Sequence, residues 1–144
     1  MAILLYCLKM PYYNKINTKI QKRCVKIAKS LVDMPNGKNK HFSFIFRRTK
    51  LLSIGWNNYE KTHPMTVEYG YRGRTIHSEM MALLNIRRIE RFTNCYLVNV
   101  RINSKYELRM SKPCLNCVKL LKSHGIIDIY YTNHLGKFEY VRYR

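Results

Sequence analysis

The chain of 144 residues carries 27 Lys and Arg against 8 Asp and Glu, which gives a formal net charge of +19 at pH 7. Its length suits one domain, and 47% hydrophobic with 24% charged residues is typical of a globular protein, not of a disordered or fibrous one. The near-apolar stretch 1–8 is less than half of the ~20 residues that a bilayer span needs, and it lacks the basic segment of a signal peptide. We therefore expect a cytoplasmic or otherwise intracellular protein without a membrane partner.

Five cysteines are spread along the chain, and only Cys114 and Cys117 stand at a spacing with chemical meaning. Their odd number argues against a disulfide framework. The positive charge has two interpretations: a polyanionic partner such as nucleic acid, or the Lys-, Asn-, Ile- and Tyr-rich composition that an AT-rich genome imposes. We favour the polyanion, because like charges in a small domain repel one another and lower its stability.

The first predicted element is a helix over residues 14–32, within a basic N-terminal region, 1–35. Its apolar residues recur at steps of three or four: Ile16, Ile20, Cys24, Ile27 and Leu31. Lysines and arginines fill the remaining positions, so the pattern predicts one buried stripe below a basic face. The segment Pro35-Asn36-Gly37 ends the helix, since proline blocks its continuation and Asn-Gly favours a turn.

Two strands follow, over residues 41–47 and 50–56, and their short joint predicts a hairpin. Residues 57–76 show no hydrophobic period and include a His-Pro pair and two glycines, which indicates a long loop. A loop of this length in a compact domain is usually functional. A second helix is predicted from His77 to Arg91.

The last third of the chain alternates between strands and one helix. We expect a buried strand at 95–102, a helix from Pro113 to Gly125, and strands at 126–132 and 138–143. The five residues between the last two strands are too few for a parallel connection, which needs about a dozen or more. The terminal strands should therefore pair antiparallel.

Two short motifs open two of the predicted helices: His77-Ser78-Glu79, and Pro113-Cys114-Leu115-Asn116-Cys117. Cysteines at i and i+3 of a helix start share one face, and the helix N-terminus stabilises their thiolates. With His77 they make a three-ligand zinc site, whose open fourth position distinguishes a catalytic zinc from a structural one. Glu79 is then placed to move protons to and from a bound water.

A lone Cys-x-x-Cys also occurs in four-ligand zinc sites and in redox pairs. The remaining cysteines could complete an all-cysteine cluster, but Cys7, Cys24 and Cys95 fall at positions typical of small core residues. Glu79 taken alone is an ordinary acidic residue in a first helical turn. The occurrence of both motifs together favours a catalytic zinc.

From Phe42 onward the chain resembles the zinc-dependent nucleoside, nucleotide and nucleic-acid deaminases, whose signature is His-x-Glu followed by Pro-Cys-x-x-Cys. The segment Gly55-Trp56-Asn57 is similar to the Gly-Trp-Asn of the tRNA adenosine deaminases. The resemblance implies an α/β class, a three-layer α/β/α fold in which a mixed five-stranded sheet ends in an antiparallel hairpin. It also implies one domain over 1–144 with its catalytic core at 41–144, one Zn²⁺ per chain, and the homo-oligomers common in this family.

The resemblance also implies roles for individual residues. Glu79 takes a proton from the attacking water and passes it to the ring nitrogen, while the exocyclic amine leaves as ammonia. Asn57 contacts the nucleoside, and the pocket uses the backbone of Ser78, which stands where the family commonly has alanine. The loop before the second helix adds candidate substrate contacts that suit bases and phosphates: His63, Tyr71, Arg72 and Arg74. A solvated loop covering the core explains these four equally well.

We therefore predict zinc-dependent hydrolytic deamination of a nucleobase. Cytosine is preferred to adenine, because the short terminal hairpin resembles that of the free-nucleoside cytidine deaminases. The substrate is single-stranded nucleic acid, with the basic helix face as a binding track, or a free (deoxy)cytidine nucleotide such as dCMP. The alternatives are an adenosine deaminase acting on RNA and a catalytically silent, zinc-stabilised nucleic-acid-binding module; Glu79 argues against the second of these.

Overall fold

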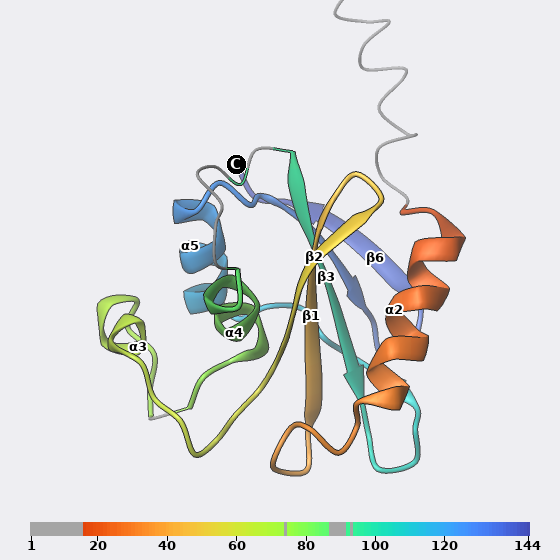
Figure 1. Cartoon of the computed structure of the whole chain (residues 1–144), viewed down its shortest axis with the longest axis horizontal. Coiled ribbons are helices and arrows are strands. Elements are labelled where there is room, and N and C mark those ends of the chain that lie inside the picture. The colour runs from red at the N-terminus through yellow and green to blue at the C-terminus, as the bar shows by residue number, and fades with distance from the viewer. Residues whose placement is uncertain (1–15, 74, 87–91, 93) are drawn as a thin grey trace, which may run out of the picture.

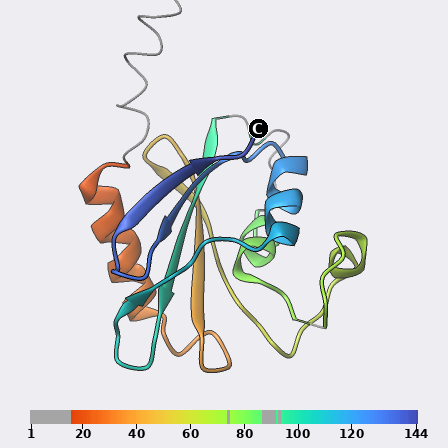
Figure 2. The ribbon, with the colours of Figure 1, turned by 180° about the vertical axis from the view of Figure 1, so that it is seen from behind.

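The computed structural model describes residues 16–73, 75–86, 92 and 94–144, which form three layers around a central mixed sheet (Figure 1). Helix α2 covers one face of the sheet, and α4 and α5 lie on the other, as the view from behind also shows (Figure 2). The elements are α2 (Thr18–Ser30), β1 (Lys40–Arg47), β2 (Lys50–Trp56), α3 (Pro64–Glu68), α4 (Ser78–Leu84), β3 (Cys95–Ile102), β4 (Leu108–Arg109), α5 (Leu115–Ser123), β5 (Asp128–Thr132) and β6 (Phe138–Arg142). The expected three-layer α/β/α arrangement is confirmed.

The strands follow the order β2-β1-β3-β5-β6, and all neighbours pair antiparallel except β3 and β5. The antiparallel hairpin β5–β6 confirms the prediction from the five-residue link. The sheet has six strands where the sequence predicted five, because the two-residue β4 pairs with Arg101 and Ile102 at the end of β3. A strand of two residues is too short to show a hydrophobic period.

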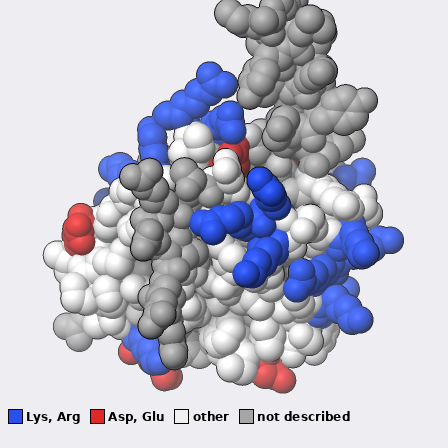
Figure 3. All heavy atoms as spheres, turned by 45° about the horizontal axis from the view of Figure 1, so that its top comes forward, with Lys and Arg blue, Asp and Glu red and all other residues white. Residues whose placement is uncertain are grey.

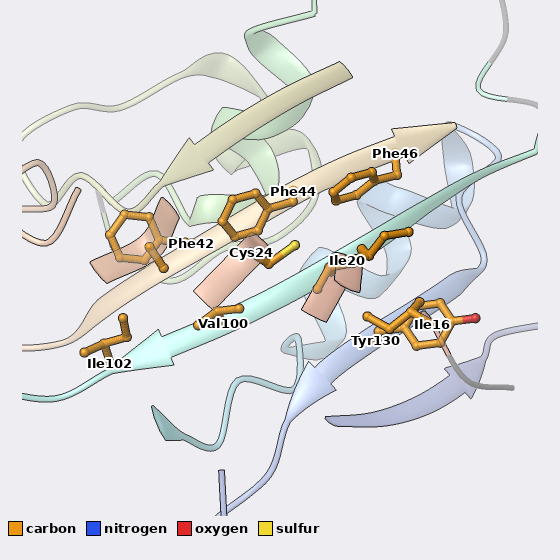
Figure 4. Packing of buried hydrophobic residues seen from close by; sticks show 11 residues of the cluster. Ile16, Ile20, Cys24, Phe42, Phe44, Phe46, Val100, Ile102 and Tyr130 are labelled. Atoms are coloured by element: carbon orange, nitrogen blue, oxygen red, sulfur yellow. The ribbon is translucent and has the colours of Figure 1, made fainter. Parts of the chain in front are cut away.

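The face below α2 is an apolar core. Phe42, Phe44 and Phe46 of β1 are fully buried against Ile20 and Cys24 of the helix (Figure 4). Helix α2 begins at Thr18, after Asn17, whose side chain accepts a hydrogen bond from the backbone N–H of Lys19 at 2.8 Å. Residues 14 and 15 of the predicted helix lie outside the described residues, and the helix ends at Ser30, not at Val32.

The opposite face holds a second core, and β2 and α4 meet there at unusually short distance. A Cβ atom at Gly55 would lie 2.2 Å from the backbone N of Ala82 and 2.3 Å from the carbonyl O of Ser78. Only glycine therefore allows this approach. The conformation of Gly-Trp-Asn is thus coupled to the position of the α4 N-terminus, where the first chemical motif stands.

Two further predictions need correction. The long loop 57–76 contains the short helix α3, which begins with Pro64 in its first turn, and an isolated bridge between Asn58 and Ile76 closes the loop. Helix α4 ends at Leu84 with Asn85 as its C-cap, earlier than the predicted Arg91; residues 87–91 lie outside the described part. None of the helices described is both long and apolar enough to cross a membrane.

Candidate active site

Three metal-ligating side chains come together where two helices begin. His77 is the N-cap residue of α4, Cys114 is the N-cap residue of α5, and neither side chain makes a capping hydrogen bond. Cys117 lies in the first turn of α5 and is fully buried, whereas Cys114 is exposed and His77 is half-buried. The three side chains therefore lie where they could hold a metal ion between the two helices.

The spacing of these side chains fits one zinc ion. His77 Nδ1 lies 3.7 Å from Cys114 Sγ and 3.5 Å from Cys117 Sγ, and all three ligand atoms lie within 4.8 Å of one another. Bond lengths of about 2.0 Å to nitrogen and about 2.3 Å to sulfur at a tetrahedral angle separate the two atoms by about 3.5 Å. Within the described part of the chain the group has three members, as a site with an open fourth position requires.

The two thiols differ in how readily they ionise. Hydrogen bonds, first with Cys117 and then with His77, lower the pKa of Cys114 to about 4 against the effect of its burial. Burial, followed by the hydrogen bond with Cys114 and the charge of Glu79, holds the pKa of Cys117 well above its usual value. A metal ion that binds here therefore displaces the proton of Cys117, because only the thiolate is a good ligand.

The Glu79 carboxylate lies against this group and is only 6% exposed. Its Oε1 accepts a hydrogen bond from Asn99 Nδ2 at 2.7 Å. Its Oε2 lies 3.3 Å from both the Ser78 hydroxyl and Cys117 Sγ, each of which donates to it. The Asn99 amide thus fixes one carboxylate oxygen, and the other oxygen faces Cys117.

A buried polar network extends from Glu79 into the sheet. The hydroxyl of Ser43 donates to Asn99 Oδ1 at 2.6 Å and lies 2.8 Å from the hydroxyl of Ser78. Asn99 Nδ2 also donates to the carbonyl O of Ser111 at 3.0 Å, and the Ser111 hydroxyl returns a bond to Asn99 O at 2.9 Å. Sequence reasoning missed Ser43, Asn99 and Ser111. For Ser43 and Asn99, a lone polar residue between the apolar residues of a buried strand was a usable signal.

Tyr71 contacts two of the three ligands. Its hydroxyl lies 2.8 Å from Cys117 Sγ, and its ring meets the His77 imidazole edge-on with centroids 4.9 Å apart. Burial, together with the nearby Cys117, raises the pKa of Tyr71, so the phenol keeps its proton and donates it toward sulfur. The sequence predicted Tyr71 as a substrate contact, and the structure places it against the metal ligands instead of among the residues that line the neighbouring cavity.

A cavity of about 210 Å³ opens beside the three ligands. Its lining comprises His41, Asn57, Tyr59, Thr75, Ile76, His77, Ser78, Glu79, Ser111, Lys112 and Cys114. Three of the residues expected near the substrate, Asn57, Ser78 and Glu79, therefore line one space with two of the expected metal ligands. His41 and Lys112 are additions that sequence reasoning missed.

Asn57 and His41 are linked at one side of this cavity. Asn57 is 5% exposed, and its Oδ1 accepts a hydrogen bond from the backbone N–H of His41 at 2.9 Å. Its Nδ2 donates to the carbonyl O of Asn36 at 3.4 Å. Burial lowers the pKa of His41, and Arg101 and His77 lower it further against the opposing effect of Glu79.

The other candidates from the loop lie elsewhere. His63 is the N-cap residue of α3, and its Nδ1 accepts a hydrogen bond from the backbone N–H of Met65 at 3.2 Å. Arg72 is exposed and does not line the cavity, and Arg74 lies outside the described residues. Cys24 and Cys95 are buried in the two cores, as expected, and Cys7 lies outside the described residues.

The fold is similar to that of two crystal structures of one phage enzyme. The dCMP deaminase from the cyanophage S-TIM5 in apo form has a TM-score of 0.55 and 19% identity, covering 83% of this chain and 86% of that chain. The same enzyme in complex with dCMP and dUMP has a TM-score of 0.58 and 20% identity, covering 83% and 85%. A search of curated protein sequences finds no significant match.

A family model points in the same direction over most of the sequence. The model described as "Cytidine and deoxycytidylate deaminase zinc-binding region" matches residues 15–133, a range that contains both motifs and every described residue that lines the cavity. The His/Cys/Cys group with its zinc-compatible spacing agrees with that description. The chain therefore belongs to the family of zinc-dependent cytidine and deoxycytidylate deaminases.

Proposed function

We propose that this protein deaminates the cytosine of a (deoxy)cytidine nucleotide to uracil and releases ammonia, with zinc held by His77, Cys114 and Cys117. The observation that carries the proposal is the position of Glu79: its carboxylate is buried at the floor of a cavity, with Oε2 at 3.3 Å from Cys117 Sγ. Zinc bound by the three residues supplies a Lewis acid that lowers the pKa of water towards about 7. The remaining steps fall to the side chains of this chain.

Proton transfer is assigned to Oε2 of Glu79. Asn99 occupies Oε1, so the proton taken from water resides on the oxygen that faces the ligands and the cavity. Glu79 delivers a proton to the ring nitrogen as the oxygen of water bonds to C4. It then takes the remaining proton from the hydroxyl on C4 and passes it to the amine, so that the C4 carbonyl forms as the C4–N bond breaks. Water is consumed, ammonia leaves, and the carboxylate ends the cycle ionised as it began.

The cavity supports a small substrate. At about 210 Å³ it lies below the range of about 300–1,000 Å³ typical of drug-sized ligands. It therefore suits one base with part of its sugar. The Glu79 carboxylate is held in place by the network of Ser43, Asn99 and Ser111. Asn57, which lines the cavity, is the candidate nucleoside contact.

Cytosine is supported over adenine by the short β5–β6 hairpin and by the similarity to the fold of a deaminase crystallised with dCMP and dUMP. An adenosine deaminase acting on RNA is the second candidate, because Gly55-Trp56-Asn57 resembles the motif of that group and its Asn57, directly after β2, lines the cavity. A free nucleotide is supported by the size of the cavity and by its position across the sheet from the basic α2. Association into homo-oligomers stays a prediction.

The test is deamination by the zinc-loaded protein of dCMP, deoxycytidine, adenosine and short single strands of DNA and RNA. We expect conversion of a cytosine substrate to its uracil product. Glu79→Gln keeps the shape of the side chain and removes the proton carrier, so turnover should fall about 10²- to 10⁴-fold or more. Zinc content should stay at one per chain in that variant, and it should be lost in Cys114→Ala.

Glu68→Gln is the matched control, since it makes the same chemical change at an exposed position on α3. It should leave turnover unchanged. Near-normal activity of Glu79→Gln would show that another group moves the protons. Absence of deamination with every substrate, in protein that holds one zinc, would favour the silent binding module.

A further inference from the structure

Three basic residues stand in a row across the end of the sheet. His41 of β1 pairs with Arg101 of β3, and Arg101 pairs in turn with Arg109 of β4. Cross-strand partners place their side chains on the same face of a sheet, close enough that the like charges of Arg101 and Arg109 destabilise their pair. The two paired arginines are therefore an unfavourable arrangement of charge at this end of the sheet.

The row lies on the face that holds the cavity. Side chains two residues apart along a strand share a face, and Asn99, two residues before Arg101, binds Glu79 at 2.7 Å. His41 itself lines the cavity, and Lys112, three residues after Arg109, lines it as well. Arg101 thus stands beside the cavity, one strand away from a wall residue.

The positive charge in this row is poorly balanced by the described residues. Arg109 has Glu107 at 3.5 Å, but both side chains are about half exposed, so solvent weakens the pair. Arg101 Nη2 donates to the neutral Asn39 Oδ1 at 2.7 Å. The Nε of Arg101 is buried and has no hydrogen-bond partner, although a buried donor without a partner is costly.

We propose that Arg101, together with His41 and Lys112, binds the phosphate of the substrate nucleotide. A phosphate oxygen would satisfy Arg101 Nε and balance the charge of the row, and the planar guanidinium suits phosphate geometry. The proposal rests on the proposed function, since it places the base at Glu79 and the phosphate at the β3–β4 end of the cavity. The phosphate is either the monoester of a nucleotide or the diester of a strand.

The experiment compares kcat/KM for three substrates: dCMP, deoxycytidine, and a short single-stranded DNA with one cytosine and no terminal phosphate. In the unaltered protein we expect dCMP to exceed deoxycytidine by at least about 10-fold, the effect of one or two charge-assisted hydrogen bonds. Arg101→Gln should lower the ratio of dCMP to deoxycytidine by about 10- to 100-fold, mainly through KM. If the unaltered protein instead prefers the DNA strand to dCMP, and Arg101→Gln lowers kcat/KM for that strand by the same factor, the site binds a phosphate diester.

A second variant and a control guard against loss of folding. Lys112→Gln changes an exposed side chain and should lower the same ratio, to a smaller extent. Arg23→Gln removes the same charge from the exposed face of α2, across the sheet, and should leave the ratio unchanged. Zinc content and melting temperature are measured for each protein.

Two results would overturn the inference and leave the proposed function intact. One is equal kcat/KM for dCMP and deoxycytidine in the unaltered protein. The other is a loss in Arg101→Gln that is the same for both substrates while zinc stays bound, because a structural role would affect both. Failure of the proposed function looks different, since no substrate would then be deaminated.

Discussion

The two faces of β1 and β3 carry different chemistry on the same backbone. Toward α2, the strands present Phe42 and Phe44 with Val98 and Val100, all fully buried among apolar neighbours. Toward α4 and α5, the residues between them include a serine and an asparagine, Ser43 and Asn99, which are cross-strand partners and equally buried. The strand period of two therefore separates a face that supplies stability from a face that supplies the site.

The comparison shows how a polar site is built inside a small domain. A buried polar group is costly unless it is hydrogen-bonded, and both Ser43 and Asn99 have partners within the network that ends at Glu79. The apolar face needs no such precision, because burial of its side chains is favourable in any well-packed arrangement. We therefore expect substitutions on the two faces to have separable effects.

The largest expected effect on stability is that of Phe44→Ala. Truncation of a fully buried phenylalanine should lower the free energy of unfolding by about 3–5 kcal/mol, because it removes apolar contact and leaves a cavity. The protein that remains folded should keep one zinc per chain, since Phe44 faces away from the ligands. Urea denaturation followed by circular dichroism, with zinc analysis of the folded protein, measures both quantities.

Val67→Ala is the control for that experiment. Val67 is 84% exposed on α3, so its truncation should change the free energy of unfolding by no more than about 0.5 kcal/mol. Loss of zinc from folded Phe44→Ala would show that the two faces are coupled. If Phe44→Ala leaves the free energy of unfolding nearly unchanged, α2 does not pack against β1 as described.

The next effect concerns zinc affinity. Tyr71→Phe removes the hydroxyl that lies 2.8 Å from Cys117 Sγ and keeps the ring beside His77. A hydrogen bond to a metal ligand orients it and stabilises its anionic form, and its loss typically lowers metal affinity by about 10- to 100-fold. Competition with a chromophoric chelator measures the change without any use of catalysis.

Tyr69→Phe is a close match for this change. The hydroxyl of Tyr69 lies 2.7 Å from Ser123 Oγ, so the control also loses one phenolic hydrogen bond but none to a zinc ligand. Its zinc affinity should equal that of the unaltered protein. If Tyr71→Phe binds zinc as tightly as the unaltered protein, the hydroxyl does not support the metal ligands, and the predicted role of Tyr71 as a substrate contact is favoured.

The sequence predicted the apolar face and the metal group better than the rest of the molecule. Steps of three and four place Ile20 and Cys24 toward the sheet, and two motifs with fixed spacing indicated His77, Cys114 and Cys117 before any contact was known. Local patterns carry such information because each motif lies within one helical turn. No local pattern indicates two residues that line the cavity, because His41 of β1 and Lys112 of the segment after β4 come together only when the sheet has formed.

Short elements were the other source of error. Helix α3 has five residues and β4 has two, and neither length is enough to show a period. The signal for α3 was local instead: Pro64 suits the first turn of a helix, and His63 suits its cap. For β4, the pairing with Arg101 decides the conformation, and no residue within the segment predicts a strand by itself.

The smallest expected effect on catalysis is that of the basic face of α2, which the sequence suggested as a track for a nucleic-acid substrate. The structure places this face across the sheet from the cavity, and Lys and Arg side chains gather on that side of the surface (Figure 3). Lys22, Lys26 and Lys29 border a groove there together with Lys137. A strand held in this groove would lie on the side of the sheet opposite Glu79.

We therefore expect Lys22→Gln, Lys26→Gln and Lys29→Gln in combination to leave kcat/KM for dCMP within about two-fold, the size of a typical remote surface effect. If the face binds single strands, log Kd should depend less steeply on log salt by about 0.7 per lost phosphate contact, or about 2 for three lysines. A salt titration with a labelled oligonucleotide, alongside dCMP kinetics, measures both. At low salt, the triple variant could instead deaminate an oligonucleotide about 10-fold more slowly than the unaltered protein while its dCMP kinetics stay the same. That result would mean that the strand passes around the sheet edge and that the two faces act together.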